Sequence, residues 1–168
     1  MPYICSIIIE NHYKTTIMTL KYSSPSVAIK NYKESAIAKS ETNDCVVRAI
    51  AAASGWEYDK AHQFVADEFN RKYRKGTFRF NQTMNKLADN NRRLNRKKIS
   101  IISKGEMKNG KSRMTIGSFI KNYSKGTYVV VVRGHAFSIK DGEVIGGNRE
   151  DARKMRCILQ GAWKIGTK

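Results

Sequence analysis

The sequence predicts an α+β fold in which helices come first and an antiparallel sheet follows. Apolar residues recur at helical spacing between 45 and 73, whereas 127–133 is a continuous β-branched run. Asp141-Gly142, a strong tight-turn signal, separates two strand-like segments. With 168 residues and no internal repeat or long linker, the chain is expected to form a single domain over 1–168. We assign 1–40 to an N-terminal extension and 41–168 to the core.

The N-terminal extension is predicted to contain a hairpin and a short helix. Alternation over the first 22 residues favours two strands joined by a loop at 10–13. Ser24-Pro25-Ser26 indicates the start of a helix that runs to about Ser35. Residues 36–42 are expected to form a connecting loop.

Three helices are predicted next. Thr42-Asn43-Asp44 is a run of capping residues directly before an apolar segment, which predicts a helix over 45–53 that stops at Gly55. Its apolar stripe indicates that this helix is largely buried. Two further helices are expected over 59–73 and 82–89.

The remaining elements are mostly strands. A basic stretch at 91–98 precedes a short strand at 99–103, and a polar segment that contains glycine follows at 104–113. Thr115 is predicted to cap a helix that ends near 123. The strands expected after it are a central buried strand at 127–133, a hairpin of 135–140 with 143–146, and a last strand from about 157 to 165.

Positive charge dominates the composition. Lys and Arg number 32 against 14 Asp and Glu, which gives a net charge of +18. Such a surface attracts polyanions, so nucleic acid or an acidic protein is a candidate partner. Alternatively, the charge only keeps a small protein in solution. The densest basic cluster comprises Arg92, Arg93, Arg96, Lys97 and Lys98.

Several classes of protein are disfavoured. The three cysteines show no CxxC spacing, which argues against a disulfide framework and a structural zinc site. No metal or cofactor site is therefore expected. The longest apolar run, 128–132, is far shorter than the roughly 20 residues of a membrane helix. With no secretory signal at the N-terminus, we expect a cytoplasmic protein without membrane contact.

Cys45 and His135 are the candidate chemical groups. A thiol in the first turn of a helix lies where unpaired N–H groups and the helix dipole favour the thiolate, and these N–H groups can also stabilise an oxyanion. His135 opens a strand directly after Gly134 and could act as the base. Alternatively, Cys45 is a small core residue and His135 simply ends a strand at the surface.

A resemblance bears on this choice. The segment from Thr42 to Ile50, with Asn-Asp-Cys at its centre, resembles the start of papain-like cysteine hydrolases found in many bacteriophage proteins. The segment from Gly134 to Val144 resembles their histidine strand and hairpin. Bacteriocin-processing peptidases share the Asp-Cys pair and the later histidine. The similarity spans about 45–147 and implies a papain-like core with Cys45 as nucleophile and His135 as base.

The rest of the family's site matches less well. The resemblance implies an Asp near Gly146 to orient the histidine, but the nearest acceptor is Asn148. The family's oxyanion Gln has no counterpart, because Lys39 stands six residues before Cys45. Asn43 could substitute, although it and Asp44 are also natural capping residues.

Two functions remain open. The first is a cysteine hydrolase or acyl transferase that acts on an amide or thioester bond of a protein or peptide, as a phage protein in the host cytoplasm. The second is a catalytically degraded papain-like fold that binds nucleic acid or an acidic host protein through its basic surface.

Overall fold

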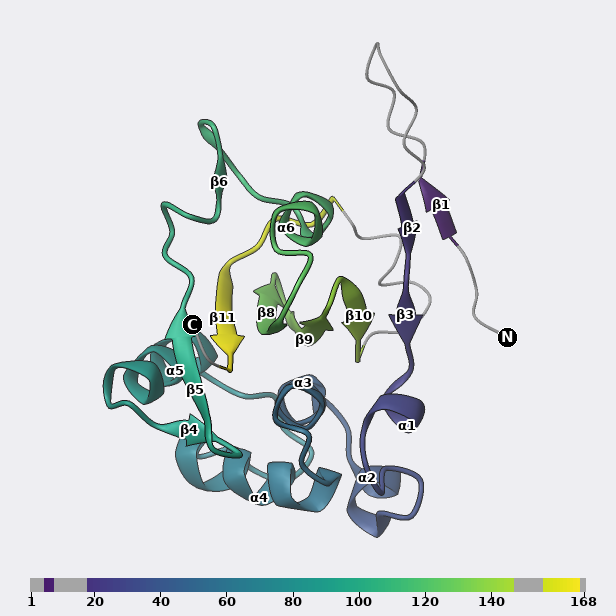
Figure 1. Cartoon of the computed structure of the whole chain (residues 1–168). Helices are drawn as coiled ribbons and strands as arrows, with labels where there is room; N and C mark the ends of the chain where they lie inside the picture. The colour runs from purple at the N-terminus through teal and green to yellow at the C-terminus, as the bar shows by residue number, and fades with distance from the viewer. Residues whose placement is uncertain (1–4, 8–17, 147–155, 167–168) are drawn as a thin grey trace.

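A computed structural model of the chain has helices on both faces of a large sheet (Figure 1). It describes residues 5–7, 18–146 and 156–166. Helices α3, α4 and α5 lie on one face and α6 on the other. The mixed α+β architecture predicted from the sequence is therefore confirmed. The expected loop at 10–13 and Asn148 lie outside the described residues.

The central sheet has seven strands in the order β3-β10-β9-β8-β11-β5-β4. Its neighbours pair antiparallel except β3 and β10, which are parallel. The strand β8 lies in the middle of this order, as its continuous β-branched run predicts. The strands are β3 (Tyr22–Ser23), β4 (Arg93–Leu94), β5 (Lys97–Ile101), β8 (Thr127–Val132), β9 (His135–Lys140), β10 (Glu143–Ile145) and β11 (Gly161–Ile165).

Two small hairpins accompany this sheet. The first pairs β1 (Cys5–Ile7) with β2 (Met18–Leu20) antiparallel, which confirms the predicted N-terminal hairpin. The second lies within the polar segment 104–113 and pairs β6 (Lys108–Asn109) with β7 (Ser112–Arg113).

The described residues contain six helices. They are α1 (Pro25–Ala28), α2 (Ala36–Ser40), α3 (Cys45–Ser54), α4 (Tyr58–Phe69), α5 (Phe80–Asp89) and α6 (Ile116–Asn122). The helix α3 ends at Gly55, which takes the left-handed conformation expected of a C-terminal cap (φ 76°). The helix α6 begins with a reciprocal capping box between Thr115 and Ser118. Both of these ends agree with the sequence prediction.

The prediction for 24–42 is wrong. The helix that begins at Pro25 stops at Ala28, because Ile29 turns to extended backbone and is buried (φ −105°, ψ 126°). The predicted loop instead contains α2. Its N-cap is Ser35, whose side chain accepts a hydrogen bond from the Ala38 backbone N–H at 2.9 Å.

Other boundaries shift because residues other than glycine adopt positive φ. Asn70 ends α4 four residues earlier than 73 (φ 50°), and Arg79 starts α5 at Phe80 rather than at 82 (φ 53°). Asn95 and Arg96 form a turn with positive φ at both positions, so the basic stretch folds into the β4–β5 hairpin. The last strand begins only at Gly161.

The sheet divides the buried residues into two clusters. Side chains from α3, α4 and α5 pack with Val129, Ala136 and Trp163 on one face. On the other face, α6 packs with Val130, Phe137 and Ile139. Alternate residues of β8 and β9 thus serve opposite faces. Within the described residues, no helix has the length and apolar character needed to cross a membrane.

Candidate active site

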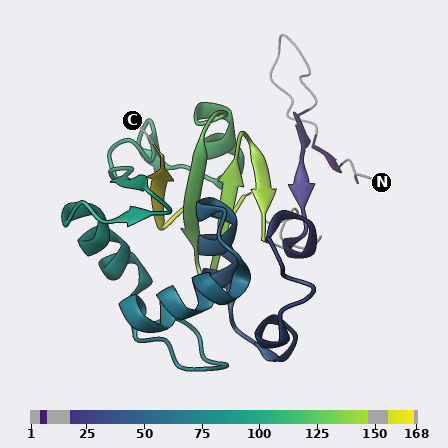
Figure 2. The ribbon, with the colours of Figure 1, turned by 60° about the horizontal axis from the view of Figure 1, so that its bottom comes forward.

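Cys45 is the first residue of α3, a helix that packs against β8 and β9 (Figure 2). Seven of the ten residues of α3 are buried, because its sequence is apolar almost all round. At its middle, the Ser138 hydroxyl of β9 donates a hydrogen bond to the Ala49 carbonyl at 3.2 Å. The thiol is partly exposed and free. The cysteine thus stands at the open end of a rigidly seated helix.

The sequence suggested Asp44 as a capping residue, but its side chain makes no capping hydrogen bond to α3. Two other side chains hold its carboxylate instead. Tyr58 donates its hydroxyl to Oδ2 at 2.7 Å, and Arg48 approaches Oδ1 at 3.1 Å. Burial and the hydrogen bond to this carboxylate raise the pKa of Tyr58. The hydrogen bond from Tyr58 therefore anchors Asp44, the residue directly before the cysteine, to α4.

Glu41 anchors the preceding loop. Its carboxylate accepts hydrogen bonds from Arg71 at 2.9 and 3.0 Å, while the same guanidinium donates to the Thr42 carbonyl at 3.2 Å. His62 lies 2.7 Å from the same carboxylate. Burial opposes ionisation of Glu41, but hydrogen bonds from Arg71 and His62 outweigh it and lower its pKa to about 2. The loop before Cys45 is thereby tied to the end of α4.

Asn43 takes a left-handed backbone conformation (φ 55°). Its side-chain amide donates a hydrogen bond to the Arg74 carbonyl at 3.4 Å. This contact takes the place of the capping role that the sequence suggested. Asn43 nevertheless borders the same cavity as Cys45. It remains a candidate oxyanion donor by position.

His135 opens β9 after a turn in which Gly134 has φ 76°. The alternation of β9 places Ala136 and Ser138 toward α3, and Phe137 toward α6. His135 is in phase with Phe137, and the two rings stack with centroids 5.8 Å apart. The histidine is therefore in register with the α6 face at the end of β9, with its Nε2 shielded from solvent.

Cys45 and His135 line one cavity of about 290 Å³. Val131 and Val132, which serve opposite faces of the sheet, both border it, so the cavity wraps around the end of the β8–β9 hairpin. This shared cavity brings together three of the four predicted site residues, with Asn148 outside the described part. Its lining residues are Asn43, Cys45, Val46, Gly76, Thr77, Phe80, Val131, Val132, Gly134, His135, Ala136 and Gln160.

Sequence reasoning missed Gln160. It stands directly before β11, and its backbone N–H donates to the Val131 carbonyl at 2.7 Å. The pairing of β11 with β8 brings this residue to the cavity from 115 positions beyond Cys45. No local sequence motif predicts such a residue. Only the order of strands in the sheet could have indicated it.

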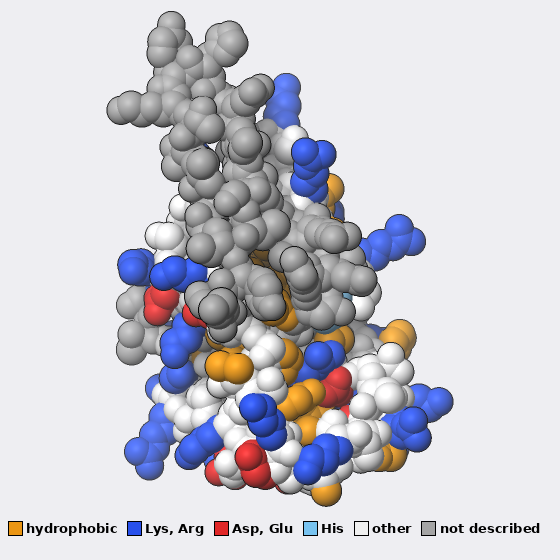
Figure 3. Space-filling model, turned by 90° about the vertical axis from the view of Figure 1, so that its right-hand side faces the viewer, with side chains coloured by type: hydrophobic (Ala, Val, Ile, Leu, Met, Phe, Trp, Pro, Cys, Tyr) orange, Lys and Arg blue, Asp and Glu red, His pale blue; other side chains and the backbone are white. Residues whose placement is uncertain are grey.

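The predicted basic cluster lies at the β4 edge of the sheet, in the segment just after α5 and on the β4–β5 hairpin. Arg92 forms an ion pair with Glu68, and Lys97 Nζ lies 3.4 Å from the Ala53 carbonyl. None of the five cluster residues borders the Cys45 cavity. On the face shown in Figure 3, Lys and Arg side chains are scattered rather than gathered in one patch. The net charge is thus spread beyond the predicted cluster.

Among the described residues, no group of three or more His, Cys, Asp or Glu side chains is placed to hold a metal ion. Cys157 is a second free thiol, partly exposed, on the opposite side of the sheet core.

Comparison with protein families, curated proteins and solved structures finds no match to this chain. The papain-like relationship therefore stays a prediction, and the function has to be argued from the site itself.

Proposed function

We propose that the protein is a cysteine hydrolase or acyl transferase that acts on an amide or thioester bond of a protein or peptide. One observation carries the proposal: Cys45, at the start of a buried helix, and His135, at the start of a central strand, border the same cavity. A nucleophile and a base from distant parts of the chain thus face one space.

In the proposed reaction, the Cys45 thiol gives its proton to the His135 imidazole, and Sγ forms a bond to the substrate carbonyl carbon. Collapse of the tetrahedral intermediate breaks the bond from that carbon to nitrogen or sulfur. The imidazolium returns its proton to the leaving group. Water, or an amine in a transferase, then attacks the thioester and restores the thiol.

The oxyanion of the intermediate needs hydrogen-bond donors. The first N–H groups of α3 have no acceptor within the helix and point to its open end. Asn43 and Gln160 border the same cavity, and their carboxamides are the side-chain candidates. The Asn43 amide already donates to Arg74, which favours Gln160. Asn148 remains the candidate to orient His135.

The test is alkylation by iodoacetamide as a function of pH, with each cysteine peptide followed by mass spectrometry. In the wild type, we expect Cys45 to react about tenfold faster than Cys157 near pH 6, where an ordinary thiol with a pKa of about 8.5 is protonated. The His135→Ala variant should lose this excess, while Cys157 serves as the internal control. A Cys45 that reacts slowly and independently of His135 would refute the catalytic pair.

A second candidate function is binding to nucleic acid or an acidic host protein, which the net charge of +18 favours. In this reading the cavity is catalytically degraded. Its test is the salt dependence of binding to a fluorescein-labelled dT12 oligonucleotide, for the wild type and for an Arg93→Gln, Arg96→Gln, Lys98→Gln variant. Binding with a steep salt slope that flattens in this variant supports the second function. Weak binding that the variant leaves unchanged contradicts it.

A further inference from the structure

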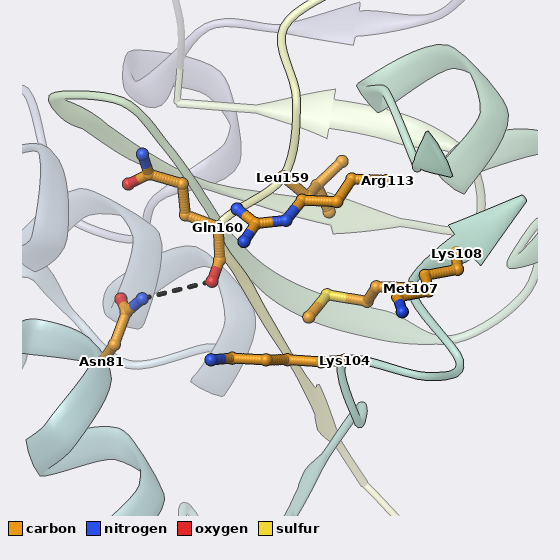
Figure 4. Close-up of a pocket in the computed structure, with 7 residues that line it drawn as sticks. All are labelled: Asn81, Lys104, Met107, Lys108, Arg113, Leu159 and Gln160. Carbon is orange, nitrogen blue, oxygen red and sulfur yellow. Dashed lines mark hydrogen bonds between the residues drawn. The ribbon is translucent and has the colours of Figure 1, made fainter. Parts of the chain in front are cut away.

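A second, larger pocket lies beside the cavity of Cys45 and His135. Its volume is about 420 Å³, and it is lined by Asn81, Lys104, Met107, Lys108, Arg113, Leu159 and Gln160 (Figure 4). We call it the basic pocket. Three of its lining side chains are cationic, and none of the seven carries a carboxylate. Glu106, on the same loop, directs its carboxylate to the Ser103 backbone N–H at 2.8 Å.

The two cavities share a wall. Gln160 borders both of them, and the neighbouring residues Phe80 and Asn81 of α5 border one each. The Asn81 amide donates to the Gln160 carbonyl at 3.3 Å, whereas the Gln160 side chain extends away from Asn81 (Figure 4). A peptide bound in the Cys45 cavity that continues past Gln160 therefore enters the basic pocket.

The basic pocket is held in shape by its backbone. Met114 donates to the Met107 carbonyl at 2.9 Å, and Leu159 donates to the Met114 carbonyl at 3.0 Å. These bonds join the β6–β7 hairpin to the segment before β11. In Figure 4, the Lys104 and Arg113 side chains extend toward the side that Asn81 and Gln160 form. The cations are thus presented on a fixed frame.

The lining indicates which anion fits. The buried side chains of Met107 and Leu159 offer an apolar floor beneath the cations. A glutamate side chain suits this arrangement, because its methylene groups can cover the floor while its carboxylate reaches Lys104 and Arg113. None of the lining residues is aromatic, so the pocket has no platform on which nucleic-acid bases could stack.

We infer that the basic pocket is a substrate subsite that binds an acidic residue of a peptide whose scissile bond lies in the Cys45 cavity. The binding of an acidic residue is inferred from the pocket alone. The placement of a scissile bond in the Cys45 cavity rests on the proposed function. Acidic peptides are thereby assigned as the substrate class. The Lys104, Lys108 and Arg113 side chains would set that preference.

The experiment measures binding of fluorescein-labelled hexaglutamate to the full chain by anisotropy, with labelled hexaglutamine and dT12 as comparison probes. The test variant is Lys104→Gln, Lys108→Gln, Arg113→Gln. The control variant is Lys30→Gln, Lys33→Gln, Lys39→Gln, which removes the same charge from exposed lysines that do not line the pocket. We expect hexaglutamate affinity to fall about tenfold in the test variant and less than about twofold in the control.

Equal losses in the two variants would mean general charge attraction and would overturn the inference. A test variant that loses dT12 binding but keeps hexaglutamate binding would assign the pocket to nucleic acid instead. Repeating the titration with Cys45→Ala keeps the binding question separate from catalysis, because that variant removes the nucleophile and leaves the pocket intact.

The link between pocket and cavity has its own readout. Saturating hexaglutamate should slow iodoacetamide alkylation of Cys45 in the wild type and leave its rate unchanged in the test variant. If bound hexaglutamate leaves Cys45 alkylation unchanged in the wild type as well, the pocket is not a subsite of this cavity. If Cys45 reactivity proves independent of His135 while hexaglutamate binding is confirmed, the proposed catalysis fails and the anion pocket stands.

Discussion

The hydroxyl of Tyr58 donates a hydrogen bond of 2.7 Å to the carboxylate of Asp44, the residue directly before the candidate nucleophile. Both residues are buried, with 0% and 6% of their surface exposed. The bond joins the start of α3 to the start of α4. It therefore fixes where Cys45 stands relative to the rest of the helical layer.

Tyr58→Phe should destabilise the protein by about 1–3 kcal/mol, because it leaves a buried carboxylate one donor short. The free energy of unfolding in urea measures this loss. Tyr73→Phe is the matched control, since Tyr73 is 53% exposed and its hydroxyl makes only a long contact of 3.4 Å to Ser40. Equal effects of the two substitutions would show that the bond to Asp44 contributes nothing specific.

Glu41 predicts an acid limit to stability. Its folded pKa of about 2 lies below its usual value of 4.5, so the folded state holds the proton less tightly than the unfolded chain. The stabilisation is complete above about pH 4.5 and is lost as the pH falls toward about 2. Urea unfolding of the wild type between these pH values should show the decline.

Glu41→Gln should remove that pH dependence and cost about 3–5 kcal/mol at neutral pH, because the Arg71 guanidinium is then buried without its carboxylate. Glu34→Gln, at an exposed position, is the control and should change stability by less than about 0.5 kcal/mol. If the Glu41 variant kept the wild-type decline between pH 4.5 and 2, another carboxylate would be responsible.

The elements that the sequence predicted well are those in which pattern and tertiary packing agree. The strand over 135–140 and the helix that begins at Cys45 have both a clear period and a clear stop signal. The helix predicted from 24 to 35 failed because Ile29 is drawn into the core as extended backbone. Capping patterns locate a possible start, but a tertiary contact decided where this helix ended.

The candidate site was predictable only in part, for a related reason. Cys45 and His135 each carry a local signal, namely a helix start and a glycine before a strand. Gln160 and Asn81 carry none, since they meet through the order of strands β8 and β11 and the packing of α5 beside them. Which face of β9 His135 occupies follows from its register, which the motif alone does not reveal.

Gly161 is expected to be intolerant of any side chain. A Cβ at this position would lie 2.5 Å from the Trp163 ring and 3.2 Å from the Asn81 amide. Gly161→Ala should therefore cost about 1–3 kcal/mol in urea unfolding, because the indole and the start of α5 must move. It should also weaken hexaglutamate binding, since the wall between the two cavities shifts.

Gly76→Ala is the control for Gly161, because a Cβ there would meet nothing within 4 Å. Its unfolding free energy should stay within about 0.5 kcal/mol of the wild type. A Gly161→Ala variant as stable as the Gly76→Ala variant would show that Trp163 can shift without penalty.

Gly134 sets the entry of His135 into the sheet. Its φ of 76° is unfavourable for residues with a side chain, although a Cβ would have open space around it. Gly134→Ala should lower the unfolding free energy by about 1–2 kcal/mol through backbone strain alone. Gly134→Asn should cost less, because asparagine tolerates the left-handed conformation, and should retain the wild-type pH profile of Cys45 alkylation.

If alanine and asparagine were equally destabilising, steric crowding rather than the backbone angle would be the cause. If the asparagine variant folded but lost the excess reactivity of Cys45, the position of His135 would depend on the absence of a side chain at 134.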